Sequence, residues 1–308
     1  MVQVILGRVS FSVVTVAVLL VLVFVLTHAS GDPTQQLLPD LTAKAEADEL
    51  RESLGLNRPL HIQLGDFVVN AVRGDFGDSL FQRRDALNIV LERLPATILL
   101  AGTSLCLAIG IGVPLGMVAA VSPGSWLARV ANGISLSAIA TPYFWLGMIL
   151  IIVFPVKLGV LYTSGSGSWQ HLILPAVTLA ALPMGRMAQI TRSVMLDALS
   201  QDYIRTARSK GLRGRVVVLR HGLKNAAPTI ITLGSWDLTR FLGGGTVIVE
   251  TLFAWPGVGY ELYHAADQHD YPVIQAAVFV QGSLIVLVNL VNDLAVRAVD
   301  PRIDLSSG

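Results

Sequence analysis

The sequence predicts an all-α integral membrane protein with six transmembrane helices and a small helical insertion after the first of them. Of its 308 residues, 53% are hydrophobic and 14% are charged, and the mean hydropathy is +0.64. Soluble domains carry about 25% charged residues. The apolar residues gather in runs long enough to cross a bilayer as a helix, which takes about 20 residues. The loops between these runs are alternately rich and poor in basic residues, as in multi-pass membrane proteins.

The first transmembrane helix is predicted within residues 1–30, where an apolar run extends from Val9 to Leu26. A cleavable signal peptide is the alternative interpretation. The run is long for the apolar part of such a peptide, and His28-Ala29-Ser30 is a poor cleavage site. A membrane-spanning helix that sets the topology of the later spans is therefore favoured.

Residues 31–94 form the one extended polar region and are predicted to be an extracytoplasmic subdomain. Leu41–Leu54 has the pattern of an amphipathic helix, and Leu60–Arg73 has apolar residues at helical spacing. A glycine-rich turn is expected at Gly74–Ser79. An unstructured loop is the alternative, and the regular periodicity disfavours it.

Residues 95–308 are predicted to form a five-helix core. Its first helix starts at Pro95, and its later glycines at 110, 112 and 116 favour close contact with a neighbour, because helices in lipid associate through packing. Thr141-Pro142 predicts a kink in the next span, and Pro175 and Pro183 predict bends or breaks in the span after it. The five spans are expected at 95–121, 130–154, 171–190, 227–250 and 273–296.

Basic residues in the short connections predict the topology. With the N-terminus inside, the connections 122–129, 191–225 and 297–308 are also inside and hold eleven of the twelve basic residues in the short connections, whereas the 31–94 region carries several arginines outside but is long enough to escape the rule. The outside connections 155–170 and 251–272 hold one, Lys157. This distribution predicts that both termini and the 191–225 connection are cytoplasmic.

The most basic stretch of the chain is the loop segment within 198–225. Against only two acidic residues, Asp197 and Asp202, the connection from 191 to 225 contains eight basic ones: Arg192, Arg205, Arg208, Lys210, Arg213, Arg215, Arg220 and Lys224. The pattern is typical of two short helices separated by a stop. From charge alone, a solvated loop that merely sets the topology is an equally good interpretation.

Local signals place the two short helices. Asp202 is expected to cap the first helix by accepting backbone N–H hydrogen bonds. Gly211 then lies where a helix-terminating residue adopts the left-handed conformation, and a second helix is expected over Arg213–Leu223. Tyr203 and Ala207 share a face with Gly211, so small residues there would let another surface come close.

Two sequence motifs carry a resemblance to a known family. Asp202–Leu212 has the sequence DYIRTARSKGL, and Arg220–Ala226 has RHGLKNA. This segment resembles the cytoplasmic coupling loop, or EAA loop, of ABC-importer permeases, most closely the B-type subunits of the dipeptide, oligopeptide and nickel group. Arg205 and Thr206 depart from the broad family's Glu and Ala, as is common in the peptide group. The resemblance extends from the first span to the DPRI sequence at 300–303.

The resemblance implies a type I importer permease in a bacterial inner membrane, surrounded by lipid and not bound to nucleic acid. The implied partners are a second homologous permease, two ATPase subunits and an extracytoplasmic substrate-binding protein. The chain itself would have no catalytic residue, metal or cofactor, and ATP and Mg would be bound by the ATPase subunits. Relatives carry dipeptides, oligopeptides, nickel chelates or haem. The residues implied in ATPase coupling are Asp202, Tyr203, Arg205, Ala207, Arg208, Lys210 and Gly211.

Charged residues in the fifth predicted span indicate a translocation path or gate. Asp237 and Arg240 lie three residues apart beside Trp236 and are expected to pair on one helix face. They either contact a zwitterionic peptide or form a structural ion pair at the interface with the partner permease. The following glycines, Gly243, Gly244 and Gly245, weaken the helix and permit hinging or close packing.

Two other functional classes fit less well. An intramembrane hydrolase needs a nucleophile and a base at matched depth, but all six histidines lie in loops or at span edges, and the sequence has no P-loop or HExxH motif. A secondary transporter commonly has more spans and internal repeats. The lone Cys106 excludes a disulfide within the chain.

Overall fold

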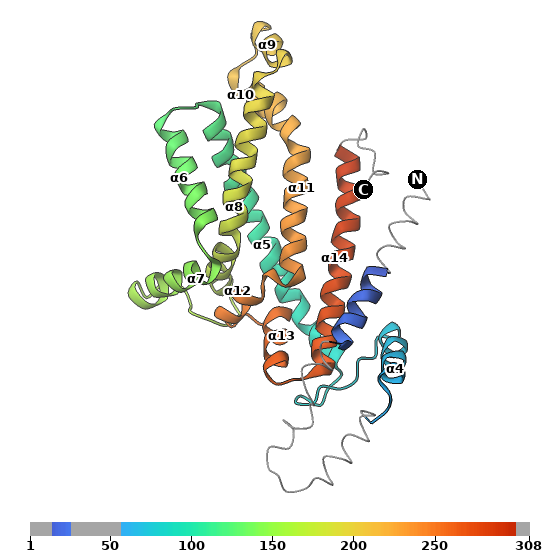
Figure 1. Cartoon of the computed structure of the whole chain (residues 1–308). Helices are drawn as coiled ribbons and strands as arrows, with labels where there is room; N and C mark the ends of the chain where they lie inside the picture. The colour runs from blue at the N-terminus through green and yellow to red at the C-terminus, as the bar shows by residue number, and fades with distance from the viewer. Residues whose placement is uncertain (1–13, 26–56, 300–308) are drawn as a thin grey trace. The chain divides into compact units, whose positions relative to one another are not determined.

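The computed structural model describes residues 14–25 and 57–299, with side chains as far as Asn292. The helix expected at 41–54, the turn expected at 29–33 and the DPRI sequence lie outside the described residues. The described chain is nearly all helical (Figure 1). It forms two compact units, residues 1–97 with 256–286 and residues 98–255 with 287–308, and the helices α5 and α14 contribute to both.

The first unit is built around one apolar cluster. It contains the helix Val14–Val25, the helices α4 (Leu60–Val72) and α13 (Val258–Asp267), and the first parts of α5 (Ala86–Val121) and α14 (Tyr271–Val299). The predicted helix after Leu60 and the following turn are confirmed, since Gly74 and Gly77 have φ of +79° and +81°. The buried residues at the centre of the cluster include Phe76, Ile89, Val90, Val258, Val273 and Ala276.

The helix α5 begins at Ala86, so the expected start at Pro95 is wrong. The Asp85 carboxylate accepts the backbone N–H of Asn88 at 2.7 Å, which is the hydrogen bond of an N-cap. Ile89 and Val90 are buried in the cluster of the first unit. Their packing offsets the hydrogen bond that Pro95 removes inside the helix.

The second unit is centred on α8 (Trp169–Ser200), which packs against α6 (Trp126–Ala140), α7 (Tyr143–Ile151) and α11 (Lys224–Arg240) (Figure 1). Small residues let the backbones approach. A Cβ atom at Gly116 would lie 2.4 Å from the Ala188 carbonyl oxygen, and one at Gly112 would lie 2.6 Å from that of Met184. The predicted close packing is confirmed at these two glycines but not at Gly110, where an added Cβ would meet nothing within 4 Å.

At two places the effect of proline on helix continuity differs from the one predicted from the sequence. Between Trp126–Ala140 and Tyr143–Lys157 the chain bends by 105°, so the expected kink at Thr141-Pro142 is a full break. The last part of this pair is a π-helical turn, η1 (Ile152–Lys157). By contrast, α8 is one continuous helix, so a break at Pro175 or Pro183 is wrong; both prolines are buried, and packing against neighbours holds the helix together.

The fifth predicted span is joined to the basic loop without an intervening turn. The short helix α10 (Gly214–Val216) continues through a π-helical segment, η2 (Val217–Leu223), directly into α11. The helix expected over Arg213–Leu223 and the start of the span expected at 227–250 are therefore parts of one continuous helix. The helix is instead interrupted in η3 (Phe241–Gly245), where Gly244 has φ of +103°, before α12 (Val247–Leu252).

Among the described residues, three helices are long and apolar enough to cross a membrane, namely α5, α8 and α14. The bent pair of α6 with α7–η1 makes a fourth if it counts as one span. The helix Val14–Val25 is apolar but shorter. The helix α11 has 17 residues and includes Asp237 and Arg240. The number of six spans stays a prediction.

Candidate functional site: a basic loop and a buried ion pair

The short helix α9 (Asp202–Ser209) is terminated by a glycine-containing C-cap motif. Gly211 has φ of +74°, as predicted for a residue in the left-handed region. Its N–H donates to the Arg208 carbonyl at 2.9 Å, and the Leu212 N–H donates to the Ala207 carbonyl at 3.4 Å. This pair of hydrogen bonds is the Schellman motif, which fixes the direction in which the chain leaves the helix.

The expected cap at Asp202 is wrong. Gln201 has the extended backbone that precedes the helix, and it makes no side-chain cap hydrogen bond. Asp202 is already the first helical residue, and its carboxylate lies 3.6 Å from the Arg205 guanidinium, with both side chains highly exposed. A negative charge in the first turn still interacts favourably with the helix dipole.

The loop has a small core of its own. Ile204 and Ala207 are 1% and 6% exposed and pack with Val217 of η2, against Leu199 at the end of α8. Ala207 therefore faces inward, and the expected open surface at this position is wrong. Tyr203 is 42% exposed, and its hydroxyl oxygen accepts a hydrogen bond from the Asn225 side chain at 3.1 Å.

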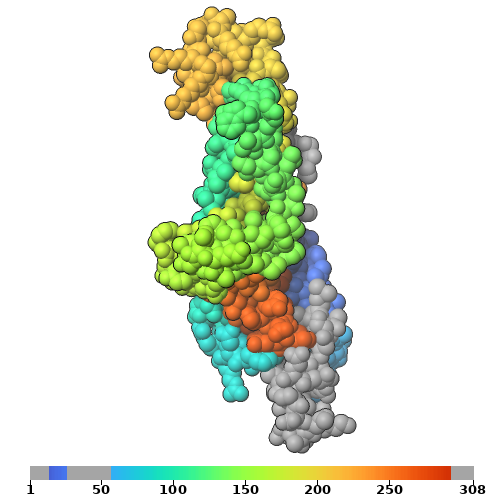
Figure 2. Space-filling view, turned by 90° about the vertical axis from the view of Figure 1, so that its left-hand side faces the viewer, coloured from blue at the N-terminus to red at the C-terminus, as the bar shows by residue number. Residues whose placement is uncertain are grey.

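The outer surface of the same segment is strongly basic. It projects from one end of the second unit, where α9 and α10 lie beyond the ends of α8 and α11 (Figures 1 and 2). Asp202 is the one acidic residue of this surface. The exposed basic residues are Arg205, Arg208, Lys210, Arg213, Arg215, Arg220 and Lys224. Such a surface suits a partner with complementary negative charge.

A buried ion pair joins α8 to α11. The Arg186 guanidinium donates to the Asp237 carboxylate, whose side chain is only 6% exposed. The expected Asp237–Arg240 pair is therefore wrong, because Asp237 faces α8 whereas Arg240 is exposed. Sequence reasoning missed Arg186. The signal was an arginine inside an apolar span, which needs a partner.

Neighbouring side chains of α11 point in other directions. Thr239 donates to the Asn289 side chain of α14 at 3.2 Å, which links the two helices. Trp236 is 67% exposed. The glycine triplet at 243–245 follows at once, and Gly243 and Gly244 are both non-helical. The asparagine at 292 has a buried side-chain oxygen with no hydrogen-bond partner among the described residues.

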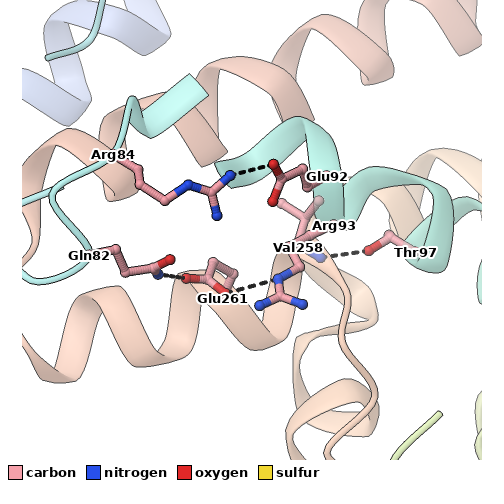
Figure 3. Close-up of polar contacts among 7 residues, drawn as sticks. All are labelled: Gln82, Arg84, Glu92, Arg93, Thr97, Val258 and Glu261. Carbon is pink, nitrogen blue, oxygen red and sulfur yellow. Dashed lines mark hydrogen bonds and ion pairs between the residues drawn. The ribbon is translucent and has the colours of Figure 1, made fainter. Parts of the chain in front are cut away.

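The first unit holds a separate polar network that sequence reasoning also missed (Figure 3). Glu261 of α13 accepts hydrogen bonds from the side chains of Gln82 at 2.6 Å and Arg93 at 3.2 Å. The Thr97 hydroxyl oxygen accepts the N–H of Val258 at 2.8 Å. The network ties the segment before α5 and the start of that helix to α13.

A second buried carboxylate reinforces this link. Asp270 accepts hydrogen bonds from the Ser79 hydroxyl and from the Leu80 N–H. Glu261 and Asp270 of the 251–272 connection thus have partners inside the first unit. Their sequence separation of up to 191 residues explains why local patterns did not reveal them.

Comparison with known proteins identifies the family. Residues 112–305 match the family described as binding-protein-dependent transport system inner membrane component. The chain is 42% identical to the glutathione transport system permease protein GsiC of Escherichia coli (strain K12) over 291 residues, which is 94% of each chain. It is 41% identical to the protein of the same name from Salmonella choleraesuis (strain SC-B67) over 295 residues, again 94% of each chain.

Solved structures agree at the level of the fold. The chain resembles the MetNI methionine ABC transporter in an inward-facing conformation with a TM-score of 0.59 and 20% identity, over 68% of this chain and 96% of that one. An amino acid ABC transporter with histidines has a TM-score of 0.51 and 15% identity, over 68% and 94%. The fold is that of a type I importer permease, and the chain belongs to the binding-protein-dependent inner membrane components, the permeases of ABC importers whose ATP is hydrolysed by separate subunits.

Proposed function

We propose that this permease forms half of the translocation pore of an importer of di- and oligopeptides, and that residues 198–225 couple it to the ATPase subunits. The observation that carries the proposal is the folded basic segment that continues directly into α11. Its inner residues are packed, so its position is defined. Its outer residues are exposed and cationic, so it can dock on another protein.

Coupling requires that the ATPase subunits bind the two states of the permease with different affinity. The outer surface for this contact comprises Asp202, Tyr203, Arg205, Arg208, Lys210 and Gly211. Ala207 has a positioning role, because it packs against Val217 and holds α9 on η2. A displacement of α9 is then transmitted through η2 to α11 without an intervening loop.

The proposed orientation follows the distribution of basic residues. The basic segment and both termini are cytoplasmic, and residues 31–94 are extracytoplasmic. ATP and Mg are bound by the two ATPase subunits, and this chain binds no cofactor. A different, homologous permease completes the pore, and a substrate-binding protein delivers the substrate from outside.

The peptide class is supported by the relatives. The proteins that are 41–42% identical over 94% of the chain are named for the transport of glutathione, which is a tripeptide. Uptake of labelled dipeptides, glutathione, nickel chelate and haem by the complete transporter in proteoliposomes tests this class. Saturable, ATP-dependent uptake of peptides supports it, and uptake of nickel chelate or haem alone contradicts it.

The coupling role is tested by charge reversal on the loop. Arg208→Glu is compared with Lys157→Glu, which reverses an exposed charge at the end of η1. We expect Arg208→Glu to abolish substrate-stimulated ATP hydrolysis and co-purification of the ATPase subunits, while Lys157→Glu retains both. An Arg208→Glu transporter with normal assembly and uptake would show that the segment only sets the topology.

A further inference from the structure

The helix α11 presents three polar side chains on different faces near its end. Successive residues of an α-helix are rotated by about 100° about the helix axis. The side chains of Asp237 and Thr239, two residues apart, therefore point in nearly opposite directions. Asp237 is held by Arg186 of α8, and Thr239 is held by Asn289 of α14. These two contacts fix the rotation of α11 about its axis. The remaining face carries Trp236 and Arg240, one turn apart and both exposed.

Among the side chains that the structure describes, one cation at this level has no counterion. Arg186 and Asp237 neutralise each other. Arg240 has no carboxylate within 4.0 Å among the described residues. Tyr143 of α7 lies within electrostatic reach of all three groups and adds a hydroxyl, not a charge. The net charge of these described groups is therefore positive.

The position of the pair places Arg240 near the level of the middle of α8, a helix long and apolar enough to cross a membrane. Arg186 lies near the middle of the 32-residue helix Trp169–Ser200, and Asp237 is at the same level because the two are in contact. Arg240 is one turn of α11 further along. A charged side chain at such a depth does not face lipid; it faces another protein chain or a water-filled cavity.

We infer that Arg240 faces the translocation path and binds a side-chain carboxylate of the passing peptide, so that the transporter favours peptides with an excess negative charge. The inference rests on the proposed peptide-import function. Trp236, one turn away, offers an exposed aromatic surface for the apolar part of the peptide. The break at Gly243–Gly244 follows immediately.

The same helix also accounts for release. Because α11 continues from the basic segment, the Trp236–Arg240 face moves whenever the ATPase subunits move that segment. A transported ligand must be bound in one state and released in another, so its site has to change with the state of the pump. A carboxylate of the partner permease is the alternative counterion for Arg240, and it would form a permanent contact.

The experiment compares three tripeptides of similar size: Ala-Glu-Ala, Ala-Gln-Ala and Ala-Lys-Ala. Uptake is measured with the complete transporter in proteoliposomes, after calorimetry has set the binding protein to equal saturation with each peptide. Arg240→Gln is expected to lower the uptake of Ala-Glu-Ala relative to Ala-Gln-Ala by about tenfold, since hydrogen bonds to charged groups contribute about that much. Arg240→Lys should keep the preference, and Arg240→Glu should shift it to Ala-Lys-Ala.

Arg129→Gln is the control, because it removes an exposed positive charge at the start of α6; it should leave the order of the three peptides unchanged. An Arg240→Gln transporter with the wild-type order, or with equal loss for all three peptides, overturns the inference and leaves the peptide function standing. Loss of the partner permease during purification of Arg240→Glu would assign Arg240 to the interface. A wild-type transporter that moves none of the peptides would instead refute the proposed function itself.

Discussion

Arg186 and Asp237 lie 51 residues apart in the sequence and form an ion pair between α8 and α11. Removing one member leaves the other charge unpaired in a largely buried position. Arg186→Met or Asp237→Leu alone is therefore expected to lower the stability of the complex by about 3–5 kcal/mol, whereas the double replacement should cost far less. Thermal unfolding of the four proteins in detergent measures the coupling. Additive effects of the two single changes would show that the pair contributes no mutual stabilisation.

Gly211 is predicted to be required for its backbone conformation. An added Cβ would meet no atom within 4 Å, but φ is +74°. Gly211→Ala should cost about 1–2 kcal/mol, the cost of the left-handed conformation for a residue with a Cβ. Gly211→Asn should cost less, since Asn tolerates this region. The rate of trypsin cleavage of the basic segment measures the effect, and we expect Gly211→Ala to be cleaved faster than the wild type.

The control for that series is Gly214→Ala in α10, where an added Cβ also meets nothing and φ is not positive. Gly214→Ala should leave the cleavage rate at the wild-type value. Equal acceleration by Gly211→Ala and Gly214→Ala would mean that the conformation at 211 is not the cause.

Gly116 is predicted to be required for its size. A Cβ there would lie 2.4 Å from the Ala188 carbonyl oxygen and 2.7 Å from the Thr191 Cβ. Gly116→Ala must push α5 away from α8, and we expect a loss of about 1–3 kcal/mol, as for other overpacked sites. Gly110→Ala in the same helix adds a methyl group in open space and should be neutral. Both are compared by thermal unfolding, and equal melting temperatures would contradict the close approach.

Thr97 is predicted to stabilise the first unit through its hydroxyl group, which accepts the N–H of the buried Val258. Thr97→Val keeps the shape and leaves that N–H without this acceptor, so it should cost about 1–3 kcal/mol. Thr97→Ser keeps the hydroxyl and should be much less damaging. Hydrogen exchange at the Val258 amide measures the effect directly, and unchanged exchange in Thr97→Val would argue against the bond.

Features that depend on local chain chemistry were predictable from the sequence. The helix end at Gly211 is predictable because left-handed backbone favours glycine, and the turn at Gly74–Ser79 is predictable for the same reason. The break near Pro142 was placed correctly, but its size was not. A proline shows where a helix stops, whereas the 105° angle depends on how α7 packs against α8 and α12.

Features that depend on tertiary contacts were not predictable in the same way. Asp237 has two arginines as candidate partners, and the sequence favours the nearer one, Arg240. The actual partner, Arg186, becomes apparent only when α8 lies beside α11. The helical pattern alone predicts an outer face for Ala207, because a local pattern does not show that η2 covers it. Glu261 and Asp270 have partners that lie far away in the chain.

The uninterrupted helix from Gly214 to Arg240 has a mechanical consequence. At about 1.5 Å per residue it is a rod roughly 40 Å long, so a tilt of about 10° at one end displaces the other by about 7 Å. That is more than one helical turn. The positive φ at Gly244 ends the rod there, so α12 need not follow the tilt. A small rotation at the basic end can thus become a large local displacement at one depth without disturbing the structure beyond it.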